Sequence, residues 1–251
     1  MKIQIKNDCY VVGDIHGEAK ALTDIFSYYN IKDCTIILLG DIGIWRYRDY
    51  KRYRCLDEYG KNNNVIIYCF RGNHDNPSFF MHSNESSPIV KRFWNKFTNF
   101  KVIPDLTVIE INNSKGIVIG GGLSIDRSIR RSFQYQYRNN SNSIYKNNDW
   151  WKNEIIPNTR FIEGKFDFIL SHVGPRPTKI HPLNEKNCGF FKLDYELKDA
   201  IETEINHLEE IQRQFQPKKW WFGHFHINDA FDFNETRCYA VDILHISPIL
   251  V

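Results

Sequence analysis

The chain has 251 residues, and its 33 lysines and arginines against 30 aspartates and glutamates give a formal net charge of +3. A composition of 42% hydrophobic, 15% aromatic and 25% charged residues is that of a globular protein and excludes a wholly disordered or collagen-like chain. The charge is too small to indicate nucleic-acid or membrane binding by itself, and the length suits a single domain over residues 1–251.

The sequence also bears on the compartment. No apolar run approaches the roughly 18 residues that a membrane span needs, and the N-terminal segment reaches charged residues before a leader-like apolar region develops. The six cysteines are scattered without a CxxC pair, at Cys9, Cys34, Cys55, Cys69, Cys188 and Cys238. We therefore expect a cytoplasmic protein with no membrane partner.

Short apolar runs rich in β-branched and aromatic residues alternate with polar or helical stretches, as in a layered α/β domain. Five of these runs end in residues that can bind a metal. They are 9–12 before Gly13-Asp14-Ile15-His16-Gly17, 35–39 before Gly40-Asp41, 65–70 before Arg71-Gly72-Asn73-His74-Asp75, 166–170 before Ser171-His172, and 219–222 before Gly223-His224-Phe225-His226. Because the carboxyl ends of strands in an open α/β sheet face one crevice, we expect these motifs to meet.

Two helices are predicted from apolar residues that recur every three or four positions. The first covers residues 18–29, and the second covers residues 194–216 and ends before Pro217. Residues 139–160 are polar and rich in asparagine, apart from Trp150 and Trp151. We expect this stretch to be an insertion or a cap loop that carries a short helix.

The candidate metal ligands are carboxylates, imidazoles and one amide, with no thiolate. They are Asp14, His16, Asp41, Asn73, His172, His224 and His226. Mixed oxygen and imidazole ligands suit Mn²⁺, Fe or Zn²⁺ better than a structural cysteine site, and Ni²⁺ is a further candidate. Seven ligands exceed one tetrahedral site but divide between two ions if one carboxylate bridges them. We expect two divalent ions, with Mn²⁺ as the first choice.

In this order, and each after an apolar run, the five motifs resemble those of the calcineurin-like metallophosphoesterase superfamily. Two looser stretches, residues 120–127 and 149–151, look like the small bacterial and phage members. The resemblance implies a four-layer αββα sandwich of two mixed β-sheets flanked by helices. It also implies the division of the ligands: Asp14, His16 and His226 for one ion, Asn73, His172 and His224 for the other, and Asp41 as the bridge.

The resemblance further implies a phosphoric ester hydrolase. Our hypothesis is the direct attack of a metal-bridging hydroxide on a phosphomonoester or phosphodiester, without a covalent enzyme intermediate. The implied catalytic residue is His74, as a protonated imidazole that stabilises phosphoryl charge or donates a proton to the leaving alkoxide. Asp75 is expected either to orient His74 or to serve a structural role.

The second motif departs from the phosphoprotein phosphatase branch, which has Gly-Asp-x-x-Asp-Arg at this point. Here the chain has Gly40-Asp41-Ile42-Gly43-Ile44-Trp45, so the second aspartate and the arginine are missing. This disfavours a protein phosphatase and indicates a smaller or different phosphoester. The candidates for substrate binding are Arg71, Arg127, Arg130, Arg131 and His181, although each arginine is equally compatible with a surface role.

Residues 46–54 and 127–138 mix arginines with aromatic residues. Rings interleaved with cations can hold a nucleotide or single-stranded nucleic acid, and a solvated helix face with tyrosines against the core is the alternative. A nuclease or cyclic-nucleotide phosphodiesterase is therefore the alternative enzyme. The alternative of another class is a non-catalytic metal-binding scaffold, which is disfavoured because scaffolds of this superfamily lose ligands or the catalytic histidine. The sequence leaves the oligomeric state open.

Overall fold

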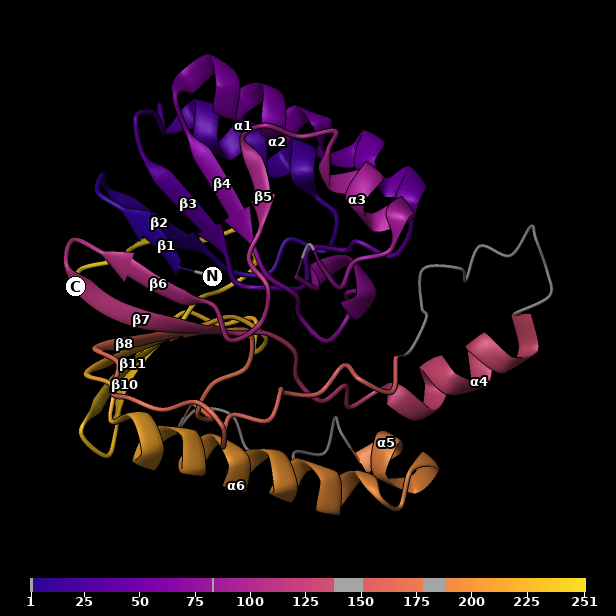
Figure 1. Ribbon diagram of the computed structural model, residues 1–251. Helices are drawn as coiled ribbons and strands as arrows, with labels where there is room; N and C mark the ends of the chain where they lie inside the picture. The colour runs from indigo at the N-terminus through magenta and orange to yellow at the C-terminus, as the bar shows by residue number, and fades with distance from the viewer. Residues whose placement is uncertain (1, 83, 138–150, 178–187) are drawn as a thin grey trace.

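The computed structural model describes residues 2–82, 84–137, 151–177 and 188–251. Two β-sheets pack face to face, and helices cover the outer face of each sheet (Figure 1). The four-layer α/β fold expected from the sequence is therefore confirmed.

The first sheet, in the described part of the chain, has five strands in the order β12-β2-β3-β4-β5. Strands β2 (Cys9–Val12), β3 (Thr35–Leu38), β4 (Ile66–Cys69) and β5 (Phe100–Val102) are parallel, and β12 (Ile246–Pro248) is antiparallel to β2. Its outer face carries helices α1 (Ala19–Tyr28) and α2 (Tyr50–Asn63). The 3₁₀ turns η1 (Tyr47–Asp49) and η2 (Pro77–Phe80) and helix α3 (Pro88–Trp94) lie on the same side (Figure 1).

The second sheet has seven strands among the described residues, in the order β1-β6-β7-β8-β9-β11-β10. They are β1 (Lys2–Ile5), β6 (Val108–Ile111), β7 (Ser114–Ile119), β8 (Phe168–Ser171), β9 (Lys219–Phe222), β10 (Asp229–Phe233) and β11 (Thr236–Ala240). The pairs β6–β7 and β10–β11 are antiparallel, and the other pairs are parallel. Helix α6 (Leu197–Phe215) packs on the outer face, with α4 (Arg127–Tyr137) and α5 (Cys188–Leu193) toward one end (Figure 1).

The central strands are mostly apolar, as expected for strands with both faces buried. In β3, Ile36 and Leu38 pack under α1 and α2, whereas Ile37 faces the second sheet. In β9, Trp221 faces the first sheet and Trp220 packs under α6. Burying an apolar side chain contributes about 1.5–3 kcal/mol, so these layers fix how the two sheets face each other.

Both predicted helices are present, α1 within residues 18–29 and α6 within residues 194–216. Helix α6 ends at Gln216, which has a left-handed backbone, because Pro217 cannot continue the helix. Of the predicted insertion, residues 139–150 lie outside the described residues, and residues 151–160 contain no helix or strand. The single-domain organisation stays a prediction. Within the described residues, no helix combines the length and apolar character needed to cross a membrane.

Candidate metal centre

The five motifs meet at one edge of the sandwich. Strands β2, β3 and β4 of the first sheet and β8 and β9 of the second end there, and each is followed at once by its motif. The structure brings together all of the candidate ligands predicted from the sequence, and His74 lies beside them, with its ring 5.9 Å from that of His16.

One group of donors combines Asp14 with His16 and His226. The His226 Nε2 atom lies 2.9 Å from Asp14 Oδ2, and the Nε2 atoms of His16 and His226 lie 3.1 Å apart. Asp14 is fully buried, whereas the side chains of His16 and His226 are 35% and 45% exposed. This group therefore forms the open side of the centre.

A second group combines Asn73, His172 and His224. The Asn73 Oδ1 atom lies 2.7 Å from His172 Nε2 and 3.1 Å from His224 Nδ1. The His172 Nδ1 atom is 2.8 Å from the carbonyl oxygen of Leu39, which can only accept. His172 therefore carries its proton on Nδ1 and turns the lone pair of Nε2 toward the centre.

The Asp41 carboxylate lies between the two groups. Its Oδ1 atom is 3.4 Å from His172 Nε2, and its Oδ2 atom is 4.0 Å from His16 Nδ1. Imidazole nitrogens that face one another beside buried carboxylates are a donor arrangement that a divalent cation satisfies. The residues present fit a pair of divalent ions, one in each group.

The two buried carboxylates have opposite electrostatic environments. Burial alone would raise the pKa of Asp14, but the hydrogen bond from His226 and the neighbouring His172 and His224 groups lower it to about 2. Burial raises the pKa of Asp41 well above its ordinary value, and the charges of Asp14 and Asp75 raise it further. Without a metal, the ionised form of Asp41 is therefore disfavoured, and a bound cation would favour the carboxylate again.

The backbone at the centre is unusual. Four candidate ligands that are not glycine have left-handed φ angles: His16 (43°), Asp41 (46°), His224 (65°) and His226 (52°). Such residues cluster at functional sites, where the surrounding structure must hold them. Glycine before a ligand allows this packing, because a Cβ at Gly72 would overlap the Asp41 carboxylate and one at Gly223 would overlap that of Asp14.

The hydrogen bonds of the Asp75 carboxylate hold two loops together and do not orient His74. Its two carboxylate oxygens accept four backbone N–H groups, from Gly72 and from residues 42, 43 and 44, at 2.7 to 3.0 Å. These bonds join the loop after β4 to the loop after β3. Of the two roles that the sequence left open, the geometry favours the structural one, and a catalytic role for Asp75 stays a prediction.

The protonation of His74 depends on its surroundings. Burial and, next, the positive charge of Arg130 lower the pKa of its imidazole to about 2. This direction favours a neutral imidazole when no metal is bound, and the protonated form expected from the sequence stays a prediction. The sequence could not indicate this, because the desolvation arises from the packing of the loops.

Three of the candidate arginines are engaged in ion pairs, Arg130 with Glu154 at 3.6 Å among them. Arg71 pairs with Asp105 at 2.7 Å and donates to the carbonyls of residues 153–155. Arg127 pairs with Asp194 at 2.6 Å and so connects α4 to the segment before α6. These contacts favour packing roles, and substrate binding by either arginine stays a prediction.

The other substrate-binding candidates have different surroundings. Arg130 is buried, and its charge acts on the pKa values of both His74 and Asp41, which places it beside the centre. Arg131 follows it on α4 and is partly exposed. His181 lies outside the described residues.

Sequence reasoning missed a buried polar group next to Asn73. The Ser124 hydroxyl accepts from Asn73 Nδ2 at 2.8 Å and donates to Glu154 Oε2 at 2.9 Å. Ser124 belongs to the 120–127 stretch noted above, but nothing in the sequence singles out Glu154, 30 residues later. Nearby, burial raises the pKa of Glu204, whose carboxylate accepts from the Leu123 N–H, to about 7.

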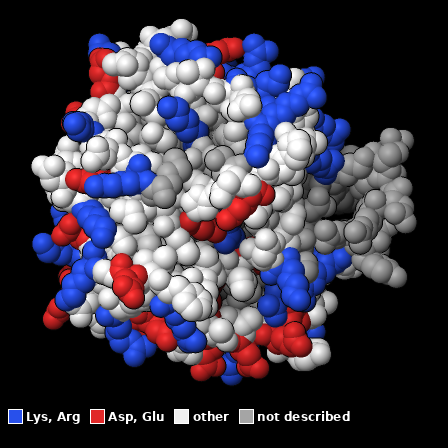
Figure 2. All heavy atoms as spheres, viewed as in Figure 1, with Lys and Arg blue, Asp and Glu red and all other residues white. Residues whose placement is uncertain are grey.

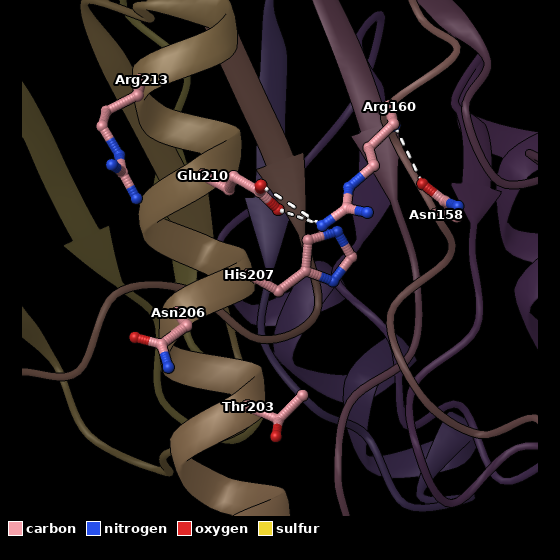
Figure 3. A pocket seen from close by; sticks show the side chains of 7 residues that line it. All are labelled: Asn158, Arg160, Thr203, Asn206, His207, Glu210 and Arg213. Atoms are coloured by element: carbon pink, nitrogen blue, oxygen red, sulfur yellow. Dashed lines mark hydrogen bonds and ion pairs between the residues drawn. The ribbon is translucent and has the colours of Figure 1, made fainter.

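A separate surface pocket lies between α6 and the segment 158–160. Its lining residues are Asn158, Arg160, Thr203, Asn206, His207, Glu210 and Arg213 (Figure 3). Figure 3 shows Arg160 reaching Glu210 across the pocket, an ion pair of 3.4 Å between exposed side chains. None of the candidate ligands lines this pocket, so it is not part of the centre.

Comparison with known proteins agrees with this geometry. A family model described as calcineurin-like phosphoesterase matches residues 9–228. No curated protein matches the chain.

Solved structures also resemble the chain. One is the protein TT1561 of Thermus thermophilus, with 13% identity over 95% of this chain and 90% of that chain and a TM-score of 0.45. A second is an archaeal phosphodiesterase, with 12% identity, 94% and 84% coverage and a TM-score of 0.37. A third is the phosphopantetheinyl hydrolase of Mycobacterium tuberculosis, with 10% identity, 96% and 90% coverage and a TM-score of 0.40.

Proposed function

The chain belongs to the calcineurin-like phosphoesterase family and is a metal-dependent phosphoric ester hydrolase, and we propose that it cleaves a phosphomonoester or phosphodiester with two divalent ions. We propose Asp14, His16 and His226 as ligands of one ion, and Asn73, His172 and His224 as ligands of the other. Asp41 would bridge them. The observation that carries this proposal is the position of the Asp41 carboxylate between the two donor groups.

The metal supplies the activation of the nucleophile. When bound, divalent ions lower the pKa of water from 15.7 to about 7 and neutralise charge on the phosphoryl oxygens. The reaction is then a direct attack of hydroxide on phosphorus, with no covalent intermediate on the protein.

The chain's own residues orient the reaction. We propose that His74 donates an N–H hydrogen bond to a phosphoryl oxygen or to the leaving oxygen, which the neutral imidazole favoured by its lowered pKa can still do. Its backbone N–H already donates to Asp41 Oδ1 at 2.8 Å, which couples its position to the proposed bridge. Arg130, buried beside His74, adds positive charge at the same place.

The test compares initial rates on p-nitrophenyl phosphate and bis-p-nitrophenyl phosphate. Protein stripped with a chelator should be inactive, and activity should return with Mn²⁺, which is compared with Fe²⁺, Zn²⁺ and Ni²⁺. Faster cleavage of the diester would favour the second candidate function, a nuclease or cyclic-nucleotide phosphodiesterase. The observation that favours this candidate is the mixture of cations and rings in η1 and α2, beside the centre.

The proposal fails if the protein binds two ions per chain and cleaves neither ester nor any of a broad panel of phosphoesters. That result would establish the non-catalytic scaffold. The cytoplasmic location and the oligomeric state are separate questions, and the location stays a prediction.

A further inference from the structure

A basic surface lies on η1, α2 and α3. Figure 2 shows lysines and arginines gathered over this part of the molecule, at the upper right. The exposed cations of the basic surface are Arg48, Lys51, Arg52, Lys91, Arg92 and Lys96. The turn η1 packs against both helices, so the cations from two separate segments form one surface.

Neighbouring carboxylates do not neutralise this surface. The ion pairs of α2 join Arg54 to Glu58 and Lys61 to Asp57, toward the end of the helix. In the described part of the chain, no carboxylate lies within ion-pair distance of the six cations. With six cations against Asp49 of η1, the basic surface keeps a net positive charge, which attracts polyanions.

Three of the cations lie over aromatic rings. The three aromatic residues are partly exposed, and the cation–π contacts hold the cations beside them. The pairs are Arg52 with Trp45 at 5.6 Å, Arg92 with Tyr47 at 5.5 Å, and Lys96 with Tyr50 at 5.7 Å.

The basic surface begins at the open side of the metal centre. Trp45 donates its indole N–H to the carbonyl of His74 at 2.6 Å. The Arg52 guanidinium lies so close to Gly17 that a Cβ on residue 17 would overlap it. Gly17 directly follows His16, which belongs to the exposed donor group. A chain of phosphates can therefore extend from the centre onto the cations of α2 and α3.

We propose that the basic surface binds a single strand of nucleic acid and leads one of its phosphodiesters to the metal centre. This inference rests on the proposed function. A small phosphoester needs only the centre, whereas cations interleaved with rings suit a repeating phosphate chain with stackable bases.

The experiment separates binding from cleavage. Fluorescence anisotropy measures the affinity of chelator-treated protein for a labelled thymidine dodecamer over a salt series. The test variant, called the α3 variant, is Arg92→Glu/Lys96→Glu, on α3 and two residues after its end. The control is Lys198→Glu/Lys218→Glu, which changes the net charge equally on exposed positions elsewhere. Cleavage of bis-p-nitrophenyl phosphate, measured separately, tests the proposed function itself and should be unchanged in both variants.

We expect the α3 variant to bind the strand at least about tenfold more weakly and to reduce the slope of log affinity against log salt by about 1 to 1.5. The control variant should change the affinity by less than about threefold. Three results would overturn the inference. They are an equal loss in both variants, no binding at low salt, and equal binding of a polyglutamate of the same charge.

A second inference concerns Ser124, and it also rests on the proposed ligand role of Asn73. The Ser124 hydroxyl has one proton and lies 2.9 Å from Glu154 Oε2, while Glu154 also accepts the Ser124 backbone N–H at 3.1 Å. Arg130 lies 3.6 Å from this carboxylate and donates to the Ser124 hydroxyl at 2.5 Å. The hydroxyl proton therefore points to Glu154, and only lone pairs face Asn73.

An oxygen that offers only lone pairs requires a donor opposite it. The Asn73 amide must then turn its NH₂ group to Ser124 and its Oδ1 atom toward His172 and His224. We infer that Ser124 and Glu154 are positioning residues that fix which atom of Asn73 faces the metal. Reversing the amide would present NH₂, which cannot bind a cation.

Titration with Mn²⁺, followed by electron paramagnetic resonance, tests this inference by resolving the two sites. Ser124→Ala and Glu154→Gln should weaken one site about 10- to 100-fold and leave the other within about threefold. Ser124→Thr retains the hydroxyl and should restore the affinity. Ser86→Ala is the control, because its buried hydroxyl donates only to the carbonyls of residues 81 and 82.

Thermal melting of the metal-free variants separates folding from positioning. The inference holds if a variant folds and loses one site selectively. It is wrong if both sites weaken together in a folded variant, or if Ser124→Ala and Glu154→Gln bind two ions as the unmodified protein does.

Discussion

The metal centre and the basic surface are both dense in charge, but they hold it in different ways. At the centre, Asp14, Asp41 and Asp75 are at most 2% exposed, and backbone N–H groups and imidazoles surround them. On the helices beside it, the side chains of Arg54 and Glu58 are 65% and 59% exposed. Buried charge is costly unless it is paired, so it shapes the loops and creates the affinity for a cation, whereas exposed charge is screened and acts mainly by attraction at a distance.

The same contrast appears in the backbone. Four of the candidate ligands adopt left-handed conformations that the surrounding hydrogen bonds must maintain. Four of the six cations of the basic surface lie on the helices α2 and α3, whose backbone needs no such support. Changes at the centre should therefore have large effects on activity or stability, and single changes on the surface should have small ones.

The largest effect expected from this comparison is the loss of turnover in Asp41→Asn. The amide lacks the charge that lies between the two donor groups, so the rate on both nitrophenyl esters should fall at least about 100-fold. Asp24→Asn, on the exposed side of α1, is the control and should keep its rate. A near-normal rate in a folded Asp41→Asn protein with its full metal content would contradict the proposed bridge.

Asp75→Asn tests the buried charge that holds loops together. Its amide offers one acceptor oxygen in place of two, and its NH₂ group would face backbone donors. We expect the free energy of unfolding of the metal-free protein to fall by about 2–4 kcal/mol in urea titrations. A loss below about 0.5 kcal/mol would show that Asp75 does not hold these loops together.

The effect of Glu204 on the free energy of unfolding should depend on pH. The pKa of this partly buried carboxyl rises from 4.5 to about 7 on folding. Because the folded state then binds the proton more tightly, Glu204 costs nothing below pH 4.5 and destabilises the fold increasingly as the pH rises toward 7.

Glu204→Gln removes that cost. Its gain in unfolding free energy over the unmodified protein should therefore grow between pH 4.5 and about 7.5, to the order of 2 kcal/mol after allowance for partial exposure. Urea titrations at several pH values measure this, with the exposed Glu202→Gln as the control. A gain that does not change with pH would contradict the shifted pKa.

The smallest expected effect is on the helix surface. Arg54→Ala removes an exposed ion pair with Glu58, four residues along α2, and should cost only about 0.3–0.5 kcal/mol. The difference should disappear in about 1 M salt, where such pairs are screened. A cost above about 1 kcal/mol would show that this surface contributes to the fold as the centre does.

Much of this protein was predictable from local sequence. The strands before the five motifs and the helices α1 and α6 are long or periodic enough to predict, and the order of the motifs indicates the fold and the chemistry. Other elements carry no such signal. Strand β10 alternates between partly exposed and exposed positions, and α2 has a polar sequence in which Tyr53 and Leu56 face the core.

The sequence by itself determined which residues can bind a metal, because each candidate ligand directly follows the strand that carries it. Only the tertiary structure decided what surrounds these residues. Partners or burial supplied by distant segments are needed for the hydrogen bonds of Asp75 and for the lowered pKa of His74. The same holds for the ion pairs of Arg71 and Arg127 and for the contact of Ser124 with Glu154. Hydrogen bonds and desolvation act through space, and the spacing of residues along a chain does not contain them.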